Sequence, residues 1–452
     1  MLNKLLPPNP LKGEQGSEFV HYSAAKSPLG DLGVIKKYNF MKKFNYLLLM
    51  ILSAMICSCS NGNKKEKNMK DYAKGTFGYD LNYLSQKDDS LIVLSGDEGN
   101  SKIIVSAKYQ AKVFTSTVDG LDGTSMGFVN YKFFDAGKVD EHMNGFGGEN
   151  RFWLGPEGGK YSVFFKSGSQ QVYDNWHTPP PVDMEPWQVT LVDSENVSFK
   201  KEMEVTNYSG NRLKLQVERS IALIERPEIE IGLGVKLNPN VKAVGYTTGN
   251  TIANLNDFEW TKETGTVCIW ILDMFNPAPN AVTFVPYNEG DSTTLGKVVT
   301  SNYFGDIPAD RLKATDRMIY LKTDGNYRSK LGLNAKRTMS IAGNYDPDSK
   351  RLTIITFDVD KDSTYLSQEW NPDKDPLTGD AMNAYNDGPL ADGSIMGPFL
   401  ELESVSRAAF LKPNEKLSHK HSVYHFVGEE ADLNPIVEKL FGISISEIKK
   451  AF

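Results

Sequence analysis

The sequence predicts an all-β fold that ends in a short helical tail. Hydrophobic and polar residues alternate along several segments, which is typical of strands with one buried face. Clusters of turn-forming residues separate these segments. No stretch before residue 430 shows a convincing helical period. Gly (38), Tyr (20) and Phe (23) are abundant, as many short strands and turns require.

The expected strands follow one another through most of the chain. Examples are residues 101–109, 160–168, 197–207, 212–224, 266–275, 351–360 and 421–428. Turns are expected at 207–211, 324–326, 346–348 and 412–414. No internal repeat and no low-complexity linker interrupts this pattern. We therefore expect one β domain over residues 73–452.

The last residues predict a helix that closes this domain. Asn434 is a suitable cap, and Pro435 is favoured in a first helical turn. Gly442 is expected to end the helix, and Ser446 to begin a last turn.

The N-terminal residues predict targeting and not a folded part. Lys42 and Lys43 precede an apolar stretch at 44–56, which is shorter than the ~20 residues of a membrane-spanning helix. The following Cys59 resembles the acylated cysteine of a bacterial lipobox; Cys57 fits less well because Ile56 precedes it. The alternative is an ordinary cleaved secretory signal.

This interpretation divides the N-terminus into three parts. Residues 1–40 would be a non-native or disordered leader, 41–58 a lipoprotein signal peptide, and 59–72 a polar tether. The expected location is the cell envelope, at the periplasmic side or the outer membrane. Contact with the membrane would be made through the N-terminal lipid only. Cys268 would be the one cysteine left in the folded part, where it is expected to be a buried apolar residue.

Composition excludes several classes of function. The formal charge is −7, with 50 Lys and Arg against 57 Asp and Glu, so a nucleic-acid partner is not expected. Six His and three Cys offer little material for a zinc framework. The spacing of Asp358, Asp360 and Asp362 resembles a calcium loop, but Ser363 stands where the sharp turn needs Gly. We expect an acidic strand end there, with no metal and no cofactor.

Two polar segments are candidates for a site. In 147–159, Asn150 and Arg151 could bind vicinal hydroxyl groups, and Trp153 could contact the apolar face of a sugar. The alternative is a tight turn with an ion pair and a core tryptophan. A second polar cluster spans 368–389, where we expect Asn386 and Asp387 to contribute to substrate binding.

Carboxylates and imidazoles follow this second cluster. Glu401 and Glu403 alternate with leucines, so both carboxylates should lie on one face of a strand. His421 shares one face of the next strand with two other histidines at 419 and 425. If the two strands form a hairpin, Glu and His could meet and transfer protons. The alternative is a polar strand face exposed to solvent.

The string GGENRFWLGPEGG, a later VTN turn, and FLELES followed by LKPNEKLSHKHSVYHF resemble the galactose-mutarotase-like superfamily, most closely its uncharacterised bacterial lipoproteins. The resemblance spans about residues 75–429. It implies a β-supersandwich, in which Asn150 and Arg151 bind sugar and Glu403, or else Glu401, is catalytic. The family's catalytic His has no counterpart here, because Glu218 and Arg219 stand near its place.

These observations together predict an envelope lipoprotein with a carbohydrate-binding cleft. If it is an enzyme, the expected chemistry is that of an aldose epimerase or mutarotase: Glu403 would be the base, and His177 or His421 the acid. The alternatives are a non-catalytic glycan-binding accessory protein and a structural envelope protein.

Overall fold

The computed structural model describes residues 70–390 and 392–452. These residues belong to one compact unit. The expected leader (1–40), signal peptide (41–58), acylated Cys59 and most of the tether lie outside the described residues. Within the described part, no helix has the length and hydrophobicity needed to cross a membrane.

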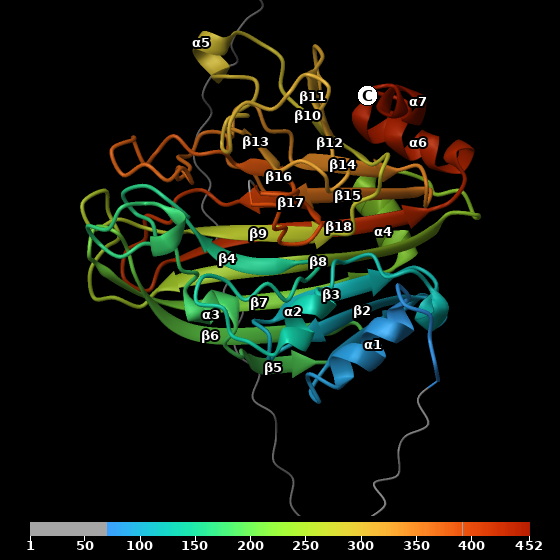
Figure 1. Ribbon diagram of the computed structural model, residues 1–452, viewed down its shortest axis with the longest axis horizontal. Coiled ribbons are helices and arrows are strands. Elements are labelled where there is room, and N and C mark those ends of the chain that lie inside the picture. Colours follow the sequence, from blue (N-terminus) through green and yellow to red (C-terminus); the bar gives the residue numbers. More distant parts are fainter. Residues whose placement is uncertain (1–69, 391) are drawn as a thin grey trace, which may run out of the picture. The chain divides into compact units, whose positions relative to one another are not determined.

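The largest element is an antiparallel sheet of ten strands (Figure 1). Its longest strands lie near the middle of the sheet, at 196–206, 212–224, 242–254 and 416–427, and buried side chains alternate with more exposed ones over much of their length. In spatial order the strands are β11 (Leu312–Ala314), β12 (Met318–Lys322), β10 (Val282–Pro286), β14 (Ile341–Asp346), β15 (Arg351–Phe357), β18 (Lys416–Val427), β8 (Lys242–Asn254), β7 (Arg212–Ile224), β6 (Asn196–Thr206) and β5 (Gln188–Val192).

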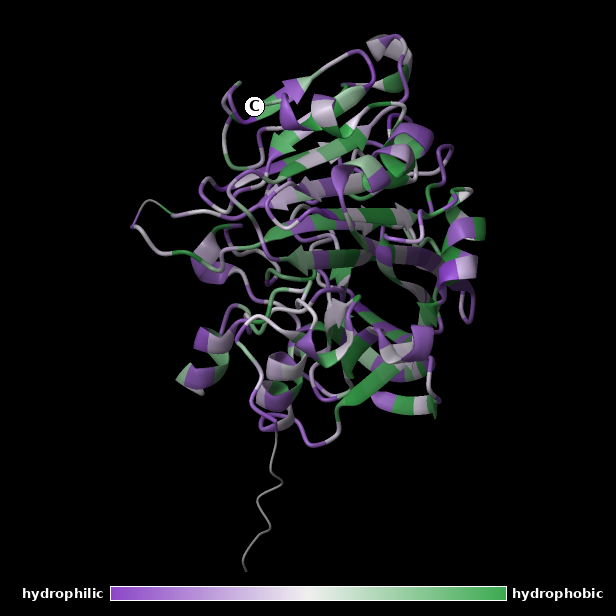
Figure 2. Cartoon of the chain, turned by 90° about the vertical axis from the view of Figure 1, so that its right-hand side faces the viewer, coloured by the Kyte–Doolittle hydropathy of each residue, from purple (hydrophilic) through white to green (hydrophobic). Residues whose placement is uncertain are grey.

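A second antiparallel sheet has five strands and packs against the first. Its order is β13 (Ser329–Leu333), β16 (Met382–Asn386), β17 (Leu400–Val405), β9 (Cys268–Phe275) and β4 (Arg151–Gly155). Apolar side chains of both sheets form the main core, for example Ile271 and Leu402 from the five-stranded sheet and Val217 and Val423 from the ten-stranded sheet. Figure 2 shows long hydrophobic segments in the strands, while the helices mix hydrophobic and hydrophilic residues.

A third, smaller sheet contains β1 (Ile92–Gly96), β2 (Ser101–Ser106) and β3 (Lys112–Thr117). Helices α1 (Phe77–Ser85) and α2 (Tyr131–Ala136) pack on it through an apolar cluster that includes Phe77, Ile104 and Phe134. The three antiparallel sheets confirm the predicted all-β sandwich.

The remaining helices are α3 (Pro180–Asp183), α4 (Arg226–Leu233), α5 (Ser292–Leu295), α6 (Glu430–Phe441) and α7 (Ile445–Lys449). Helices α4, α6 and α7 share an apolar cluster with the face of the ten-stranded sheet turned away from the main core. The predicted helical tail is confirmed, and Gly442 ends α6 in a left-handed conformation with φ 67°. The helix begins five residues earlier than expected, however, with Glu429 in place of Asn434 as its cap, so Pro435 lies inside it.

Three expectations about local structure are wrong. Helices α1 and α4 precede residue 430; each is too short to give a clear period and is stabilised by packing. Residues 160–168 form turns and one isolated bridge at Phe165 instead of a strand. Strands β17 and β18 do not form a hairpin, because β17 pairs with β16 and β9 while β18 pairs with β15 and β8.

Candidate functional site

Both faces of the five-stranded sheet carry polar side chains. Because successive residues of a strand point to opposite faces, the position of each residue in its strand determines its face. Asp273 on β9 points toward the ten-stranded sheet, where it contacts His421. Its neighbours Leu272 and Met274 therefore point away from that sheet, and both line a cavity of about 440 Å³. We refer to this cavity as the pocket.

Aromatic side chains line much of the pocket. Trp153 and Trp270 meet edge to face, with ring centroids 5.6 Å apart. Trp176 and Trp370 are nearly parallel, with centroids 6.2 Å apart. The other aromatic lining residues are Phe133, Tyr173, Phe304, Tyr385 and Phe399. These flat apolar surfaces are suited to contact with the C–H faces of a ring-shaped ligand.

An ion pair between Arg151 and Glu401 lies on the floor of the pocket. A guanidinium Nη2 of Arg151 donates to Glu401 Oε1, and the guanidinium lies 5.2 Å from the ring centroid of Trp153. Burial raises the pKa of Glu401 to about 8, even though Arg151 acts to lower it. Glu401 is thus a carboxyl group that can exchange a proton near neutral pH.

A second ion pair, between Lys330 and Glu403, lies beside the first. Lys330 Nζ donates to Glu403 Oε2 at 2.9 Å, and Trp270 Nε1 donates to the same oxygen at 2.8 Å. Burial alone would lower the pKa of Lys330, but Glu403 and Glu157 raise it above its ordinary value. Lys330 lines the pocket, whereas Glu403 is fully buried beneath it.

Charged residues from helix α2 and from loops complete the pocket: Lys132 on the helix, and Asp140, Glu157 and Arg328 on the loops. Burial raises the pKa of Glu157, against the opposing effect of Lys330. Glu157 and Glu401 are therefore two carboxyl groups in one cavity whose protonated forms are both favoured by burial.

The pocket brings together three of the residues singled out in the sequence, namely Arg151, Trp153 and Glu401, with Glu403 directly beneath. Asn150 and His421 lie between the five-stranded and the ten-stranded sheet, on the side opposite the pocket. Asp273 accepts hydrogen bonds there from Asn150 Nδ2 at 2.6 Å and contacts His421 Nε2 at 2.7 Å. They do not line the pocket.

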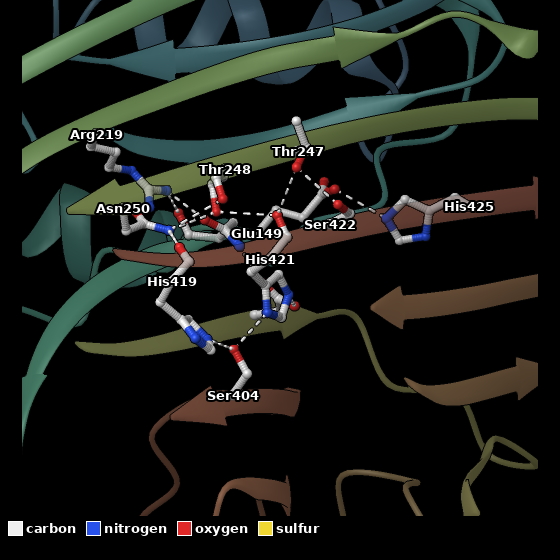
Figure 3. A network of polar contacts seen from close by, with 12 residues as sticks. Glu149, Arg219, Thr247, Thr248, Asn250, Ser404, His419, His421, Ser422 and His425 are labelled. Carbon is white, nitrogen blue, oxygen red and sulfur yellow. Dashed lines mark hydrogen bonds and ion pairs between the residues drawn. The ribbon is translucent and has the colours of Figure 1, made fainter. Parts of the chain in front are cut away.

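The contact between the two sheets contains a network of polar side chains, most of which are buried (Figure 3). The hydroxyl of Ser404 lies 2.8 Å from both His421 Nδ1 and His419 Nε2. Arg219 donates to Asn250 Oδ1 at 2.6 Å and also to Asn150 Oδ1. Burial lowers the pKa of His419 to about 3, with a further contribution from His421. The network satisfies polar groups within the core, and Arg219 belongs to it.

The other candidate residues stabilise loops. His177 lies beside the pocket in a surface loop; its ring stacks on His142 with centroids 5.0 Å apart, and its Nδ1 lies 2.7 Å from the carbonyl of Glu141. Asn386 donates to the carbonyl of Tyr327 at 2.8 Å. Asp387 accepts hydrogen bonds from Tyr385 Oη and Gly397 N at 3.0 and 2.7 Å. None of these three lines the pocket.

Sequence reasoning missed several pocket residues, above all Glu157, Arg328 and Lys330. Glu157 stands in the glycine-rich segment that was singled out, so its position was a usable signal. Lys330 occupies one face of a short buried strand, where a lone lysine indicates a buried carboxylate partner. Arg328 just precedes this strand and has no comparable sequence signal.

Among residues 70–390 and 392–452, no three His, Cys, Asp or Glu side chains are grouped so that they could hold a metal ion. Cys268 is buried, and burial raises the pKa of its thiol to about 12.

Residues 75–452 match a protein family described as "Family of unknown function (DUF6786)". The chain belongs to this family. A search of the curated proteins found no match.

Solved structures with a similar fold include three from different organisms. The Slr1438 protein from Synechocystis sp. is 12% identical, with a TM-score of 0.46, over 75% of this chain and 96% of that one. A galactose mutarotase-like protein from Lactobacillus casei is 11% identical, with a TM-score of 0.43, over 74% and 100%. A GalM/aldose epimerase homologue from C. elegans is 12% identical, with a TM-score of 0.38, over 75% and 100%.

Proposed function

We propose that the pocket binds a carbohydrate. The observation that carries this proposal is the combination, in one cavity of about 440 Å³, of tryptophan surfaces with buried charged groups. A sugar needs both, because its C–H faces are apolar while its hydroxyl groups form hydrogen bonds. Trp153 and Trp270 supply the first kind of contact, and the Arg151–Glu401 pair supplies the second.

The proposed orientation places the sugar ring against the tryptophans, with its hydroxyl groups toward the floor. Arg151 Nε is buried and makes no hydrogen bond within the described residues. If the guanidinium turns toward a bound sugar, a ligand hydroxyl can accept from this donor and offset the cost of leaving it unpaired. Glu401 can accept or donate a hydrogen bond according to its protonation state.

Binding can be tested with a glycan array followed by calorimetry on each hit. Trp370 is half-buried in the pocket wall, so we expect Trp370→Ala to weaken binding by about tenfold or more, as loss of a stacked aromatic surface typically does. Phe410→Ala is the matched control, because Phe410 is a half-buried aromatic residue that does not line the pocket. Equal losses in both variants would contradict the proposal, as would a wild type that binds no glycan.

A catalytic role is favoured by one further observation: Glu401 and Glu157, both with a raised pKa, line the same cavity. Opening a sugar ring at its anomeric carbon requires a base for the anomeric hydroxyl and an acid for the ring oxygen. In this proposal Glu401 and Glu157 fill these roles, since Glu403 is held beneath the pocket by Lys330. Anomer exchange followed by NMR should be accelerated by wild type and lost in Glu401→Gln. If the wild type binds a glycan but does not accelerate anomer exchange, the binding function would stand and the catalytic role would be refuted.

We further propose that the chain is anchored in the cell envelope by a lipid on Cys59. The lipobox-like sequence around this cysteine supports the proposal. Cys59→Ala should lose incorporation of labelled palmitate and should no longer fractionate with membranes. The matched variant Cys57→Ala should keep both properties, and lipid uptake by Cys59→Ala would refute the assignment.

A further inference from the structure

We propose that the carbohydrate recognised by the pocket carries a carboxylate, as a uronic acid does, and that Arg328 is the residue that binds this group. The inference rests on the proposed carbohydrate function and names the class of sugar.

Arg328 is held in a fixed orientation at the pocket wall. Its Nε donates to Tyr385 Oη at 3.2 Å, and Tyr385 Oη in turn donates to Asp387 Oδ1 at 3.0 Å. The guanidinium lies over the ring of Phe304, with Cζ 3.9 Å from the ring centroid. A hydrogen bond on one side and an aromatic face on another thus orient the planar group before any ligand binds.

The two Nη nitrogens of Arg328 remain available to a ligand. Within the described residues, the bond from Nε is the one hydrogen bond that this side chain makes, and no Asp or Glu forms an ion pair with it. Arg328 is half-buried, and the two fully buried cations of the pocket are already paired, Arg151 with Glu401 and Lys330 with Glu403. Arg328 is therefore the oriented cation that lacks an anionic partner.

The surroundings favour a carboxylate over a phosphate or sulfate. A guanidinium with two parallel N–H donors matches the two oxygens of a planar carboxylate. The same cavity contains the carboxyl groups of Glu157 and Glu401, and whenever either is ionised it repels a doubly charged phosphate more strongly than a singly charged carboxylate. The tryptophan surfaces require that the anion be attached to an apolar ring face, which a uronic acid supplies.

The test compares uronic-acid oligosaccharides with their carboxyl-reduced counterparts, which have the same sugar rings without the charge. The panel contains glucuronate, galacturonate, mannuronate and guluronate oligomers, together with sulfated oligosaccharides and sugar phosphates. Calorimetry on wild type should give about tenfold tighter binding to a uronate than to its reduced form, as expected for charge-assisted hydrogen bonds. Arg328→Gln should remove this preference while it still binds the reduced oligosaccharide.

Lys132→Gln is the matched control, because Lys132 is an exposed cation at the same pocket and the substitution removes the same charge. This variant should keep most of the preference for uronates. If Arg328→Gln does not fold, as judged by circular dichroism, Arg328→Lys retains the charge without the two parallel donors and should lose most of the preference.

The outcomes separate the two proposals. Equal affinity of wild type for uronates and reduced oligosaccharides would overturn the role of Arg328 while carbohydrate binding stands. A uronate preference that survives in Arg328→Gln would do the same, and tighter binding of sulfated or phosphorylated sugars would overturn the choice of carboxylate. Failure of wild type to bind any neutral or charged sugar would overturn both.

Discussion

Replacing Lys330 by methionine tests the arrangement on the floor of the pocket. The substitution keeps the length of the side chain but leaves Glu403 as a buried carboxylate without a charged partner. Glu403 is fully buried, its Oε2 accepts from Lys330 and Trp270, and its Oε1 has no partner within the described residues. Removing one member of such a pair typically costs about 3–5 kcal/mol of the free energy of unfolding.

The assay is urea unfolding at pH 7 of wild type, Lys330→Met, Glu403→Gln and the double variant. Gln at position 403 retains an oxygen for Trp270 Nε1 and removes the negative charge. We therefore expect the double variant to be more stable than Lys330→Met alone, with a coupling free energy of about 1–3 kcal/mol. The reasoning is refuted if Lys330→Met loses less than about 1 kcal/mol, the usual contribution of an exposed ion pair.

Three further predictions concern titratable groups. The pKa of His419 is lowered to about 3, so its neutral imidazole stabilises the fold fully above the unfolded pKa of ~6.5 and less as the pH falls toward 3. His419→Gln should therefore flatten the decline in melting temperature between pH 7 and 4, whereas the control His177→Gln should not. Equal slopes in the two variants would contradict the prediction. In wild type, affinity for a neutral glycan should change with an apparent pKa near 8. Calorimetry from pH 6 to 9 should show no such change in Glu401→Gln. A change in affinity that persists in this variant would show that another group titrates. In a Cys57→Ser/Cys59→Ser variant, Cys268 should resist a thiol reagent at pH 8 until urea unfolds the chain, because burial raises the pKa of its thiol to about 12. Fast reaction of Cys268 in the folded state would be inconsistent with this burial.

The sequence predicted strands β2, β6, β7, β9, β15, β17 and β18, because local alternation marks these segments, but it did not single out the central strand β8. It also placed Glu401 and Glu403 on one strand face, as the structure has them, since this depends only on the two-residue period of β17. The sequence could not show which strands pair. The hairpin of β17 with β18 was wrong for this reason, and the interior position of His421 follows from the actual pairing.

Partners from distant parts of the chain were equally invisible in the sequence. The Arg151–Glu401 contact spans 250 residues, and the Lys330–Glu403 contact spans 73. Asn150 and Arg151 are adjacent in sequence yet lie on opposite faces of the sheet. Only Arg151 of this pair therefore lines the pocket, although the motif matched both residues. Arg328 depends on a loop conformation that no short-range pattern indicates.

The floor of the pocket and its walls come from different kinds of structure, and they should tolerate change differently. Strands β4, β9 and β17 supply Arg151, Trp270 and Glu401, and the intervening residues of the same strands fill the core. Insertion or deletion of one residue in such a strand would exchange the two faces, so that charged side chains enter the core and apolar ones enter the pocket. Part of the walls comes from loops such as 392–399, where changes in length do not shift the register of a strand. Relatives that take different ligands should therefore differ mainly in loop length, and redesign of specificity is best begun in these loops.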